Sequence, residues 1–343
     1  MTRAGYEDLT VYRHESREAE CDLSDNTNLF GSAPSALASL AAWAGGDPAR
    51  YPTPGNEGLR DALASWLGVG SHQIVGGCGS NDILDSAMRA LGNPGSVLAY
   101  TSPTFVMTPH FAKANSLELV PVPTRPDGQP DVEALLGTRA PLIYVASPNN
   151  PSGVAAAIGR IRLLADRAPG VVIVDEAYTE YLGSSWAAEA IKRDNVLVTR
   201  TFSKAWGLAG LRIGYGVGSA ALVLEVEKAR GPYKVSAVAE QAAAAAVRND
   251  QAWLEEVVRK TRVIRQATAL RLRGLGFAVS SSDANFVAVT VTNAAEAGAF
   301  LAARGIAVRA MTAVPVVGDV LRITIGPESL MDRLVEAMSQ LPR

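Results

Sequence analysis

One amine, two hydroxyls and one permanent cation stand close together between positions 201 and 212. Lys204 follows an apolar run and precedes a glycine-rich stretch, and Thr201, Ser203 and Arg212 stand around it. A lysine at the end of a buried strand is partly desolvated, which lowers the pKa of its amine and lets the amine attack a carbonyl. Two hydroxyls and a guanidinium suit a phosphate dianion. The same pattern is also typical of a surface lysine in a turn whose glycines allow tight packing.

Polar side chains follow three further apolar runs. Asp175 ends one run and Tyr178 comes three residues later, while Asn150 lies in a proline-rich turn after another. Ligands of open α/β sheets bind at the carboxyl ends of the strands. The glycines at 76–79 precede a predicted helix from Ser80, and such a helix start suits an anion. Each feature taken singly is also typical of a helix cap or a tight turn.

Together these groups are an amine, a carboxylate, a phenol, an amide and a phosphate cradle. The small molecule that uses all five is pyridoxal phosphate, with its aldehyde, ring nitrogen, ring oxygen and phosphate. The glycine clusters form neither of two other phosphate-binding motifs. A P-loop is excluded because no Gly-Lys-Ser/Thr follows the glycines at 76–79, and a Rossmann fingerprint is excluded because the glycines at 214–218 do not open a first βαβ unit.

The middle of the chain predicts the sheet that positions these residues. Short apolar runs without polar alternation are typical of strands buried on both faces, and helical stretches separate them. This alternation predicts an α/β unit, a mainly parallel central sheet covered by helices. The expected strands are 96–100, 117–122, 141–146, 170–174, 195–199 and 211–217, and the expected helices include 80–91, 155–168 and 220–229.

After position 235 the pattern predicts a second, smaller α+β unit. Residues 236–273 read as two helices or one bent helix, and strands at 285–291, 306–309 and 320–325 precede a final helix. We expect an N-terminal segment (1–38) that packs with the small unit, a large domain (39–244) and a small C-terminal domain (245–343).

Composition limits the class of protein. The chain has 343 residues, 32 Lys+Arg and 34 Asp+Glu, a net charge of −2 and 48% hydrophobic residues. The hydrophobic content excludes a disordered chain. The balanced charge lacks the excess of basic residues that is typical of a nucleic-acid binder. Cys21 and Cys78 lack metal-ligand spacing and indicate reduced thiols. The N-terminus is too charged for a signal peptide, and no run of about 18 apolar residues, the length of a membrane-spanning helix, occurs. We expect a cytoplasmic protein with no membrane or metal partner.

The series Asn150, Asp175, Tyr178, Lys204 and Arg212 resembles that of fold-type I pyridoxal-phosphate enzymes. Within them it is similar to the class I/II aminotransferases, above all the histidinol-phosphate aminotransferase group. The resemblance runs from about residue 23 to residue 333, in the family's order. It implies the pyridoxal-phosphate transferase type I fold for the large domain.

The resemblance also implies roles for these side chains. Lys204 would bond covalently to the cofactor aldehyde and later move the substrate proton, and Asp175 would pair with the ring nitrogen. Tyr178 and Asn150 would contact the ring oxygen, with Asn150 also on the substrate side. Phe105, where the family usually has Tyr, would stack on the ring. The phosphate would be held by Ser80, Asn81, Thr201, Ser203 and Arg212 of this subunit, and by Tyr51 reaching from the second subunit of a homodimer.

The implied reaction moves an amino group from an amino acid or amine to a 2-oxo acid in two stages. Arg322 matches the family arginine that binds the substrate's carboxylate or phosphate. Histidinol phosphate with 2-oxoglutarate is the family default, and an aromatic or specialised-biosynthesis amine is an alternative. The stretch 26–30, Asn-Thr-Asn-Leu-Phe, replaces the family's Asn-Glu-Asn-Pro on the substrate side.

Two other classes of function remain open at this stage. A decarboxylase or amino-acid oxidase of the same fold carries the same cofactor residues. A non-catalytic, pyridoxal-phosphate-binding regulator is the alternative from another class, although only about two dozen residues precede Asn26, too few for a helix-turn-helix domain.

Overall fold

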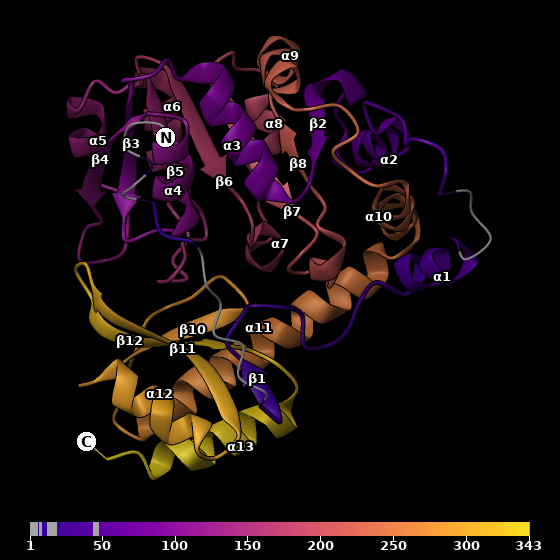
Figure 1. Cartoon of the computed structure of the whole chain (residues 1–343). Coiled ribbons are helices and arrows are strands. Elements are labelled where there is room, and N and C mark those ends of the chain that lie inside the picture. Colours follow the sequence, from indigo (N-terminus) through magenta and orange to yellow (C-terminus); the bar gives the residue numbers. More distant parts are fainter. Residues whose placement is uncertain (1–5, 7–8, 12–18, 44–47, 343) are drawn as a thin grey trace.

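The computed structural model describes residues 6, 9–11, 19–43 and 48–342, and most of the charged N-terminal stretch lies outside them. Two sheets divide these residues into an upper and a lower unit, joined by the long helix α11 (Gln251–Gly274), as Figure 1 shows. The seven-stranded sheet belongs to the larger predicted unit and the five-stranded sheet to the smaller one.

The larger unit contains a seven-stranded sheet in the order β2-β8-β7-β6-β5-β3-β4. Strand β8 runs in the opposite direction to the other six strands of this sheet, so the mainly parallel α/β sheet is confirmed. The strands are β2 (Ile74–Gly77), β3 (Val97–Ser102), β4 (Glu118–Pro123), β5 (Leu142–Ala146), β6 (Val171–Asp175), β7 (Val196–Thr201) and β8 (Gly214–Val217).

Alternate residues of each central strand enter different cores. In β6, Val172 and Val174 belong to one apolar cluster and Ile173 to another, on the opposite face. Helices cover both faces, which explains why these runs show no polar alternation. Helices α3 (Ser80–Leu91), α4 (Met107–Ala114) and α9 (Ala220–Ala229) cover one face; α2 (Glu57–Leu67), α5 (Val132–Gly137), α6 (Ile158–Arg167), α8 (Ala187–Ala190) and α10 (Ala237–Asn249) supply the other cluster.

The smaller unit is a five-stranded sheet in the order β1-β11-β12-β10-β9. Its first strand comes from the N-terminal segment and pairs in parallel with β11. Its elements are β1 (Cys21–Leu23), β9 (Ala278–Val279), β10 (Phe286–Thr290), α12 (Ala294–Ala302), β11 (Ile306–Val314), β12 (Gly318–Thr324) and α13 (Glu328–Ser339). The segment that follows β1 leads through α1 (Pro34–Ala42) to the larger unit.

The predicted helical region 236–273 forms two helices that meet at Asp250. The Asp250 carboxylate accepts hydrogen bonds from the backbone N–H and hydroxyl of Ser35, which ties this junction to α1. Leu254 of α11 belongs to the larger core and Leu272 to the smaller one. The expected limit at 244/245 therefore lies within α10, and the two cores meet along α11; we propose this helix as the connection between the two domains.

One expected strand begins later than predicted. Residues Ala209–Leu211 form a 3₁₀ turn (η3) and Arg212 has a φ of 50°, so β8 starts only at Gly214. The apolar run from 211 to 217 therefore includes the turn that carries Arg212. A second turn of this kind, η2 (Ser71–Gln73), precedes β2.

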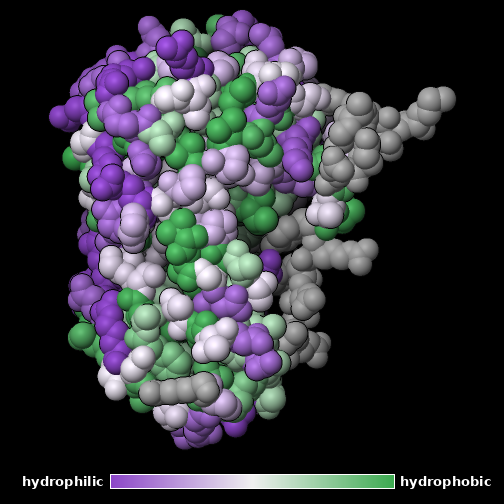
Figure 2. All heavy atoms as spheres, turned by 90° about the vertical axis from the view of Figure 1, so that its left-hand side faces the viewer, coloured by the Kyte–Doolittle hydropathy of each residue, from purple (hydrophilic) through white to green (hydrophobic). Residues whose placement is uncertain are grey.

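Hydrophobic and hydrophilic side chains intermix over the coloured part of the face that Figure 2 shows, as is usual for protein surfaces. Within the described residues, no helix combines the length and apolar character needed to cross a bilayer.

Candidate active site

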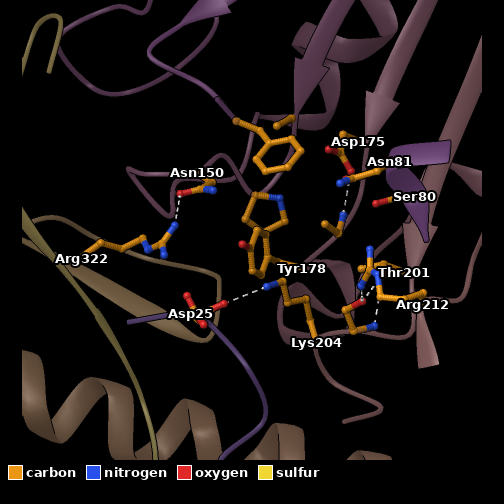
Figure 3. A pocket seen from close by; sticks show the side chains of 15 residues that line it. Asp25, Ser80, Asn81, Asn150, Asp175, Tyr178, Thr201, Lys204, Arg212 and Arg322 are labelled. Carbon is orange, nitrogen blue, oxygen red and sulfur yellow. Dashed lines mark hydrogen bonds between the residues drawn. The ribbon is translucent and has the colours of Figure 1, made fainter. Parts of the chain in front are cut away.

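Eleven of the twelve predicted site residues line one cavity of about 200 Å³ between the two units. They come from the ends of β6 and β7 and the loops after them, from the loops after β3 and β5, from the start of α3, from the turn before β8 and from β12. Figure 3 shows Lys204 and Tyr178 in the middle, Ser80, Asn81, Thr201 and Arg212 on one side, and Asn150 and Arg322 on the other. The exception is Tyr51.

Lys204 lies in the loop after β7, and its amine faces the cavity. Its Nζ donates a hydrogen bond to the backbone oxygen of Asp25 at 3.1 Å and lies 5.7 Å from the centre of the Tyr178 ring. Burial, followed by the Arg322 cation, lowers the pKa of Lys204 to about 7, while the Asp25 carboxylate opposes this shift. The amine is therefore available as a nucleophile and base near neutral pH.

The Asp175 carboxylate is buried and firmly oriented. One oxygen accepts hydrogen bonds from the Thr199 hydroxyl and the Ala177 N–H, both at 3.2 Å, and the other accepts one from the Tyr144 hydroxyl at 2.8 Å. Burial raises the pKa of Asp175, and these three hydrogen bonds oppose the rise. A cation placed against this carboxylate would favour its charged form.

Asn26 links Tyr178 of the larger unit to Thr324 of the smaller unit. The Asn26 amide donates a hydrogen bond to the Tyr178 hydroxyl at 3.0 Å, and its oxygen accepts one from Thr324 of β12 at 3.2 Å. Burial raises the pKa of Tyr178. The phenol is therefore held as a neutral hydrogen-bonding group at the cavity wall.

An anion cradle forms where the start of α3 meets the turn before β8. Arg212 donates to the Ser203 hydroxyl at 3.2 Å, and Thr201 donates to the same hydroxyl at 3.0 Å. Gly79, with a φ of 79°, precedes the helix, and a Cβ there would lie 2.8 Å from an Arg212 nitrogen. Only glycine leaves the helix N-terminus and the guanidinium this close together.

Arg322 reaches from β12 across to the larger unit. Its guanidinium donates to the Asn150 side-chain oxygen at 2.9 Å and to the backbone oxygen of Ser24 at 2.6 Å. It also lies 5.8 Å from the centre of the Phe286 ring. A cation thus lines the cavity from the side opposite the anion cradle, where it can bind a second anionic group.

The N-terminal segment closes over the loop of Lys204. Asn28 donates to the backbone oxygen of Ala205 at 2.8 Å, and Ser32 donates to that of Gly207 at 2.7 Å. Gly207 has a φ of 69°, and a Cβ there would lie 2.2 Å from the Gly31 oxygen. This close approach of two backbones requires glycine.

Tyr51 lies outside the cavity. Its side chain is 81% exposed and its ring stacks on that of Tyr233 with centres 4.6 Å apart. Within this chain it contributes nothing to the lining of the site.

The residues present fit pyridoxal phosphate. The anion cradle suits its phosphate, the amine of Lys204 its aldehyde, and the buried carboxylate of Asp175 its protonated ring nitrogen. Phe105 lines the same cavity and supplies an apolar ring. These four groups surround one space, which is the arrangement that the cofactor requires.

The family model described as aminotransferase class I and II matches residues 19–338. The chain belongs to the class I and II aminotransferases. It is 36% identical over 327 residues to the histidinol-phosphate aminotransferase of Dinoroseobacter shibae, with 92% of this chain and 90% of that protein covered. The histidinol-phosphate aminotransferase of Methylobacillus flagellatus is 35% identical over 331 residues, with 93% of this chain and 88% of that protein covered.

Solved structures agree with this assignment. The crystal structure of histidinol-phosphate aminotransferase from Sinorhizobium meliloti in complex with pyridoxal-5'-phosphate superposes with a TM-score of 0.89 at 29% identity, covering 99% of this chain and 96% of that one. The predicted family, the enzyme class, the type I fold and the cofactor are thereby confirmed. This aminotransferase is an enzyme that uses pyridoxal 5'-phosphate.

Four residues of the site were not assigned a role from the sequence: Asp25, Asn26, Tyr144 and Thr199. Tyr144 and Thr199 lie in the strands on either side of Asp175 and share its face of the sheet. Strand alternation offers a signal for both, because Thr199 stands two residues before Thr201 and Tyr144 two residues before Ala146, and both of these later residues line the cavity. Asn26 lies in the stretch 26–30 that the resemblance places on the substrate side, whereas Asp25 had no such signal, since its place depends on how the N-terminal segment crosses the cavity.

Proposed function

We propose that this aminotransferase moves the amino group of L-histidinol phosphate to 2-oxoglutarate. The observation that carries the proposal is the guanidinium of Arg322 facing the cavity opposite the anion cradle of Arg212. Two anionic positions suit a bound cofactor phosphate and one anionic group of a substrate. Both substrates carry such a group: histidinol phosphate a phosphate, and 2-oxoglutarate carboxylates.

The names of the similar proteins support this substrate. The relatives from Dinoroseobacter shibae and Methylobacillus flagellatus are both named histidinol-phosphate aminotransferases and cover most of the chain. The changed stretch at 26–30 does not disturb the two asparagines, since Asn26 and Asn28 hold Tyr178 and the Lys204 loop.

When bound, pyridoxal phosphate supplies an aldehyde that accepts the amine and a protonated ring that accepts the electron pair of the substrate's Cα–H bond. Asp175 holds the ring nitrogen protonated, and Tyr144 and Thr199 orient its carboxylate. Burial and the Arg322 cation lower the pKa of Lys204 to about 7, so a neutral amine is available near neutral pH and would remove the Cα proton.

The remaining residues bind and orient. Arg212, Ser203 and Thr201 would hold the phosphate, and Tyr178 and Asn150 would contact the ring oxygen. Arg322 orients the substrate through its anionic group while Asn150 fixes the guanidinium. Phe105, which lines the cavity, would pack on the ring and help to exclude water.

The enzyme acts, in this proposal, as a cytoplasmic homodimer. An exposed tyrosine that lies outside its own cavity suits a role at a neighbouring subunit, where Tyr51 would reach the cofactor phosphate. The free thiols of Cys21 and Cys78 suit a reducing compartment.

A half-reaction assay tests the substrate. Purified holoenzyme is mixed with L-histidinol phosphate, L-histidinol, L-phenylalanine or L-glutamate, and the absorbance of the cofactor is followed as it accepts the amino group. We expect histidinol phosphate to react at least about 100-fold faster per unit concentration than histidinol, since loss of a paired anion costs about 3 kcal/mol.

Arg322→Gln provides the matched comparison. If Arg322 binds the phosphate, this variant removes the difference between histidinol phosphate and histidinol. Equal rates for both amines in the unaltered enzyme, or a faster reaction with L-phenylalanine, contradict the proposed substrate while leaving the aminotransferase assignment in place.

A further inference from the structure

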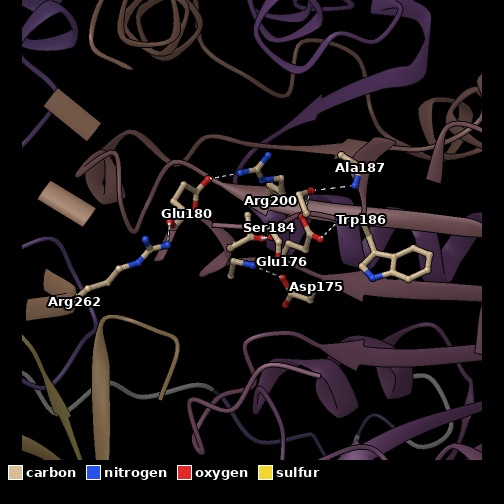
Figure 4. A network of polar contacts seen from close by, with 11 residues as sticks. Asp175, Glu176, Glu180, Ser184, Trp186, Ala187, Arg200 and Arg262 are labelled. Carbon is tan, nitrogen blue, oxygen red and sulfur yellow. Dashed lines mark hydrogen bonds and ion pairs between the residues drawn. The ribbon is translucent and has the colours of Figure 1, made fainter. Parts of the chain in front are cut away.

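Behind the cofactor site, on the other face of the sheet, two carboxylates and one guanidinium are buried together. Glu176 and Glu180 follow β6, and Arg200 lies near the end of β7. Arg200 donates to Glu180 at 2.8 Å, and the two side chains are only 5% and 4% exposed. Figure 4 shows the pair and, beside it, Glu176 directly after Asp175.

Strand alternation places this cluster opposite the site. Arg200 stands between Thr199, which donates to Asp175, and Thr201 of the anion cradle. Its own side chain faces the other way, over the rings of Trp66 at 5.3 Å and Tyr215 at 5.7 Å. The same strand end therefore holds the cofactor on one face and an ion pair on the other.

Glu176 stands two residues before Tyr178, and Glu180 stands two residues after it. Glu176 accepts hydrogen bonds from the Ser185 hydroxyl at 2.6 Å and the Trp186 N–H at 2.5 Å. The segment after Asp175 leaves the sheet, since the last ladder contact is the N–H of Glu176 to the Thr199 oxygen at 2.8 Å. Beyond this point, the side chains of Glu176 and Glu180 connect the segment to the rest of the large unit.

A buried ion pair of this kind is a poor source of stability. Removing both charges from water costs several kcal/mol, and replacing such pairs by apolar residues is often neutral or stabilising. Here one Glu180 oxygen and the Arg200 Nε also lack a hydrogen-bond partner among the described residues. Net stability therefore does not explain the pair, whereas a fixed geometry does.

We propose that Glu180 and Arg200, with Glu176, are positioning residues that fix the segment 175–180 so that Asp175 and Tyr178 meet the cofactor ring. None of the three lines the cofactor cavity, so they act through their neighbours. The proposal depends on the pyridoxal-phosphate site and not on which amine is the substrate.

The test replaces the three charges by neutral residues in the full chain, Glu180→Met and Arg200→Met with Glu176→Gln (the Met/Met chain), since Glu176 would otherwise keep a buried charge without Arg200. Two quantities are measured: the thermal unfolding midpoint without cofactor, and the dissociation constant for pyridoxal phosphate from absorbance titration. We expect the midpoint to stay equal or rise, while cofactor affinity falls about tenfold or more. An unchanged affinity overturns the proposal.

A second arm tests whether the pair acts through Asp175 and Tyr178. In a chain that already carries Asp175→Asn and Tyr178→Phe, the Met/Met replacement is expected to change the affinity less than about twofold, because the groups it positions are gone. A loss that remains tenfold shows a general effect on the fold and overturns the proposal. If the Met/Met chain does not fold, Glu180→Gln with Arg200→Gln, which removes both charges and keeps polar side chains, replaces the two Met substitutions in both backgrounds with the same comparison.

The control is the exposed ion pair between Arg271 and Asp332, which joins α11 to α13 at 2.5 Å with side chains 45% and 63% exposed. The same Met/Met replacement there leaves the cofactor affinity unchanged. A matching loss in this control would assign the effect to added apolar surface and contradict the proposal.

Discussion

At the scale of single residues, Lys204 shows how the site sets the protonation of one amine. Burial and the cations Arg322 and Arg212 lower its pKa, while the carboxylates of Asp25 and Asp175 oppose them. Desolvation and the nearby cations prevail, and the pKa falls to about 7. The amine therefore changes its charge state near neutral pH.

The first prediction follows from this pKa. As pH rises through about 7, the chain without cofactor carries more neutral Lys204, and only the neutral amine attacks an aldehyde. The rate constant for covalent capture of pyridoxal phosphate, measured by stopped-flow absorbance, should rise with pH and level off above this midpoint. Arg322→Gln removes a cation, so its midpoint should lie at higher pH; Arg271→Gln, remote from the site, should leave the midpoint in place.

A midpoint that does not move in Arg322→Gln would show that the charge of Arg322 does not act on Lys204. The comparison of variants is decisive because titration of the cofactor itself is common to all of them.

The second prediction concerns the buried carboxylate. Asp175→Asn should still bind the cofactor but lose on the order of 10³-fold in kcat, since breaking a buried ion pair costs about 3–5 kcal/mol. Tyr144→Phe keeps the carboxylate and removes one hydrogen bond of 2.8 Å, so its loss should stay below about tenfold. Steady-state kinetics of the two purified variants measure this difference; a small loss in Asp175→Asn would mean that another group protonates the ring.

At the scale of elements, the anion cradle depends on how closely β8 approaches the start of α3. A Cβ on Gly214 would lie 2.4 Å from the Ser80 nitrogen and 2.8 Å from the Arg200 oxygen, and both are backbone atoms. Neither atom belongs to a flexible side chain that can turn away. The strand and the helix N-terminus therefore meet only because position 214 has no side chain.

The third prediction uses this contact. Gly214→Ala should push the helix start away from Arg212, lower the affinity for pyridoxal phosphate and destabilise the fold by about 1–3 kcal/mol. Gly210→Ala is the control, because a Cβ there meets nothing within 4 Å. Cofactor titration and urea unfolding of both variants measure the effect, and equal behaviour of the two would contradict the role given to Gly214.

Strand and helix types followed from the periodicity of the sequence, but their ends did not. The mainly parallel sheet was predicted because runs such as 171–174 are apolar throughout. The start of β8 was misplaced, because apolar residues of the turn before it continue the same run as far as Ile213. Local composition does not distinguish a strand from a turn that is buried by tertiary packing.

At the scale of the whole molecule, the cavity is built from both units and from the N-terminal segment. Arg322 comes from the small sheet, Lys204 from the large one, and Asp25 from the segment after β1. α11 joins the two cores. A complete site therefore requires the two units to be held at a defined separation.

The fourth prediction concerns the proposed dimer. As a pure protein, the Lys204→Ala variant should be nearly inactive, and the Tyr51→Ala variant should bind the cofactor weakly. Unfolding and refolding an equal mixture creates hybrid dimers in which one site has both an intact Lys204 and an intact Tyr51. We expect about a quarter of the unaltered activity, because half of the dimers are hybrids and each has one good site of two.

The activity of the mixture distinguishes whether Tyr51 serves the site of its own subunit or that of the second subunit. If this tyrosine serves its own subunit, the hybrid sites gain nothing and the mixture shows only the mean of the two pure variants. Light scattering of each pure variant, expected to give the same dimeric mass, is the control for assembly.

The sequence by itself determined the chemistry of the site. An amine, a carboxylate, a phenol and a phosphate cradle follow strands of one sheet, and the carboxyl ends of parallel strands meet at one edge. Only the tertiary structure decided what surrounds them: Tyr144 beside Asp175, Asn26 on Tyr178, and the ion pair of Arg200 on the opposite face. These contacts join positions far apart in the chain, or depend on which face of a strand a side chain occupies at its end, and neither is visible in local spacing.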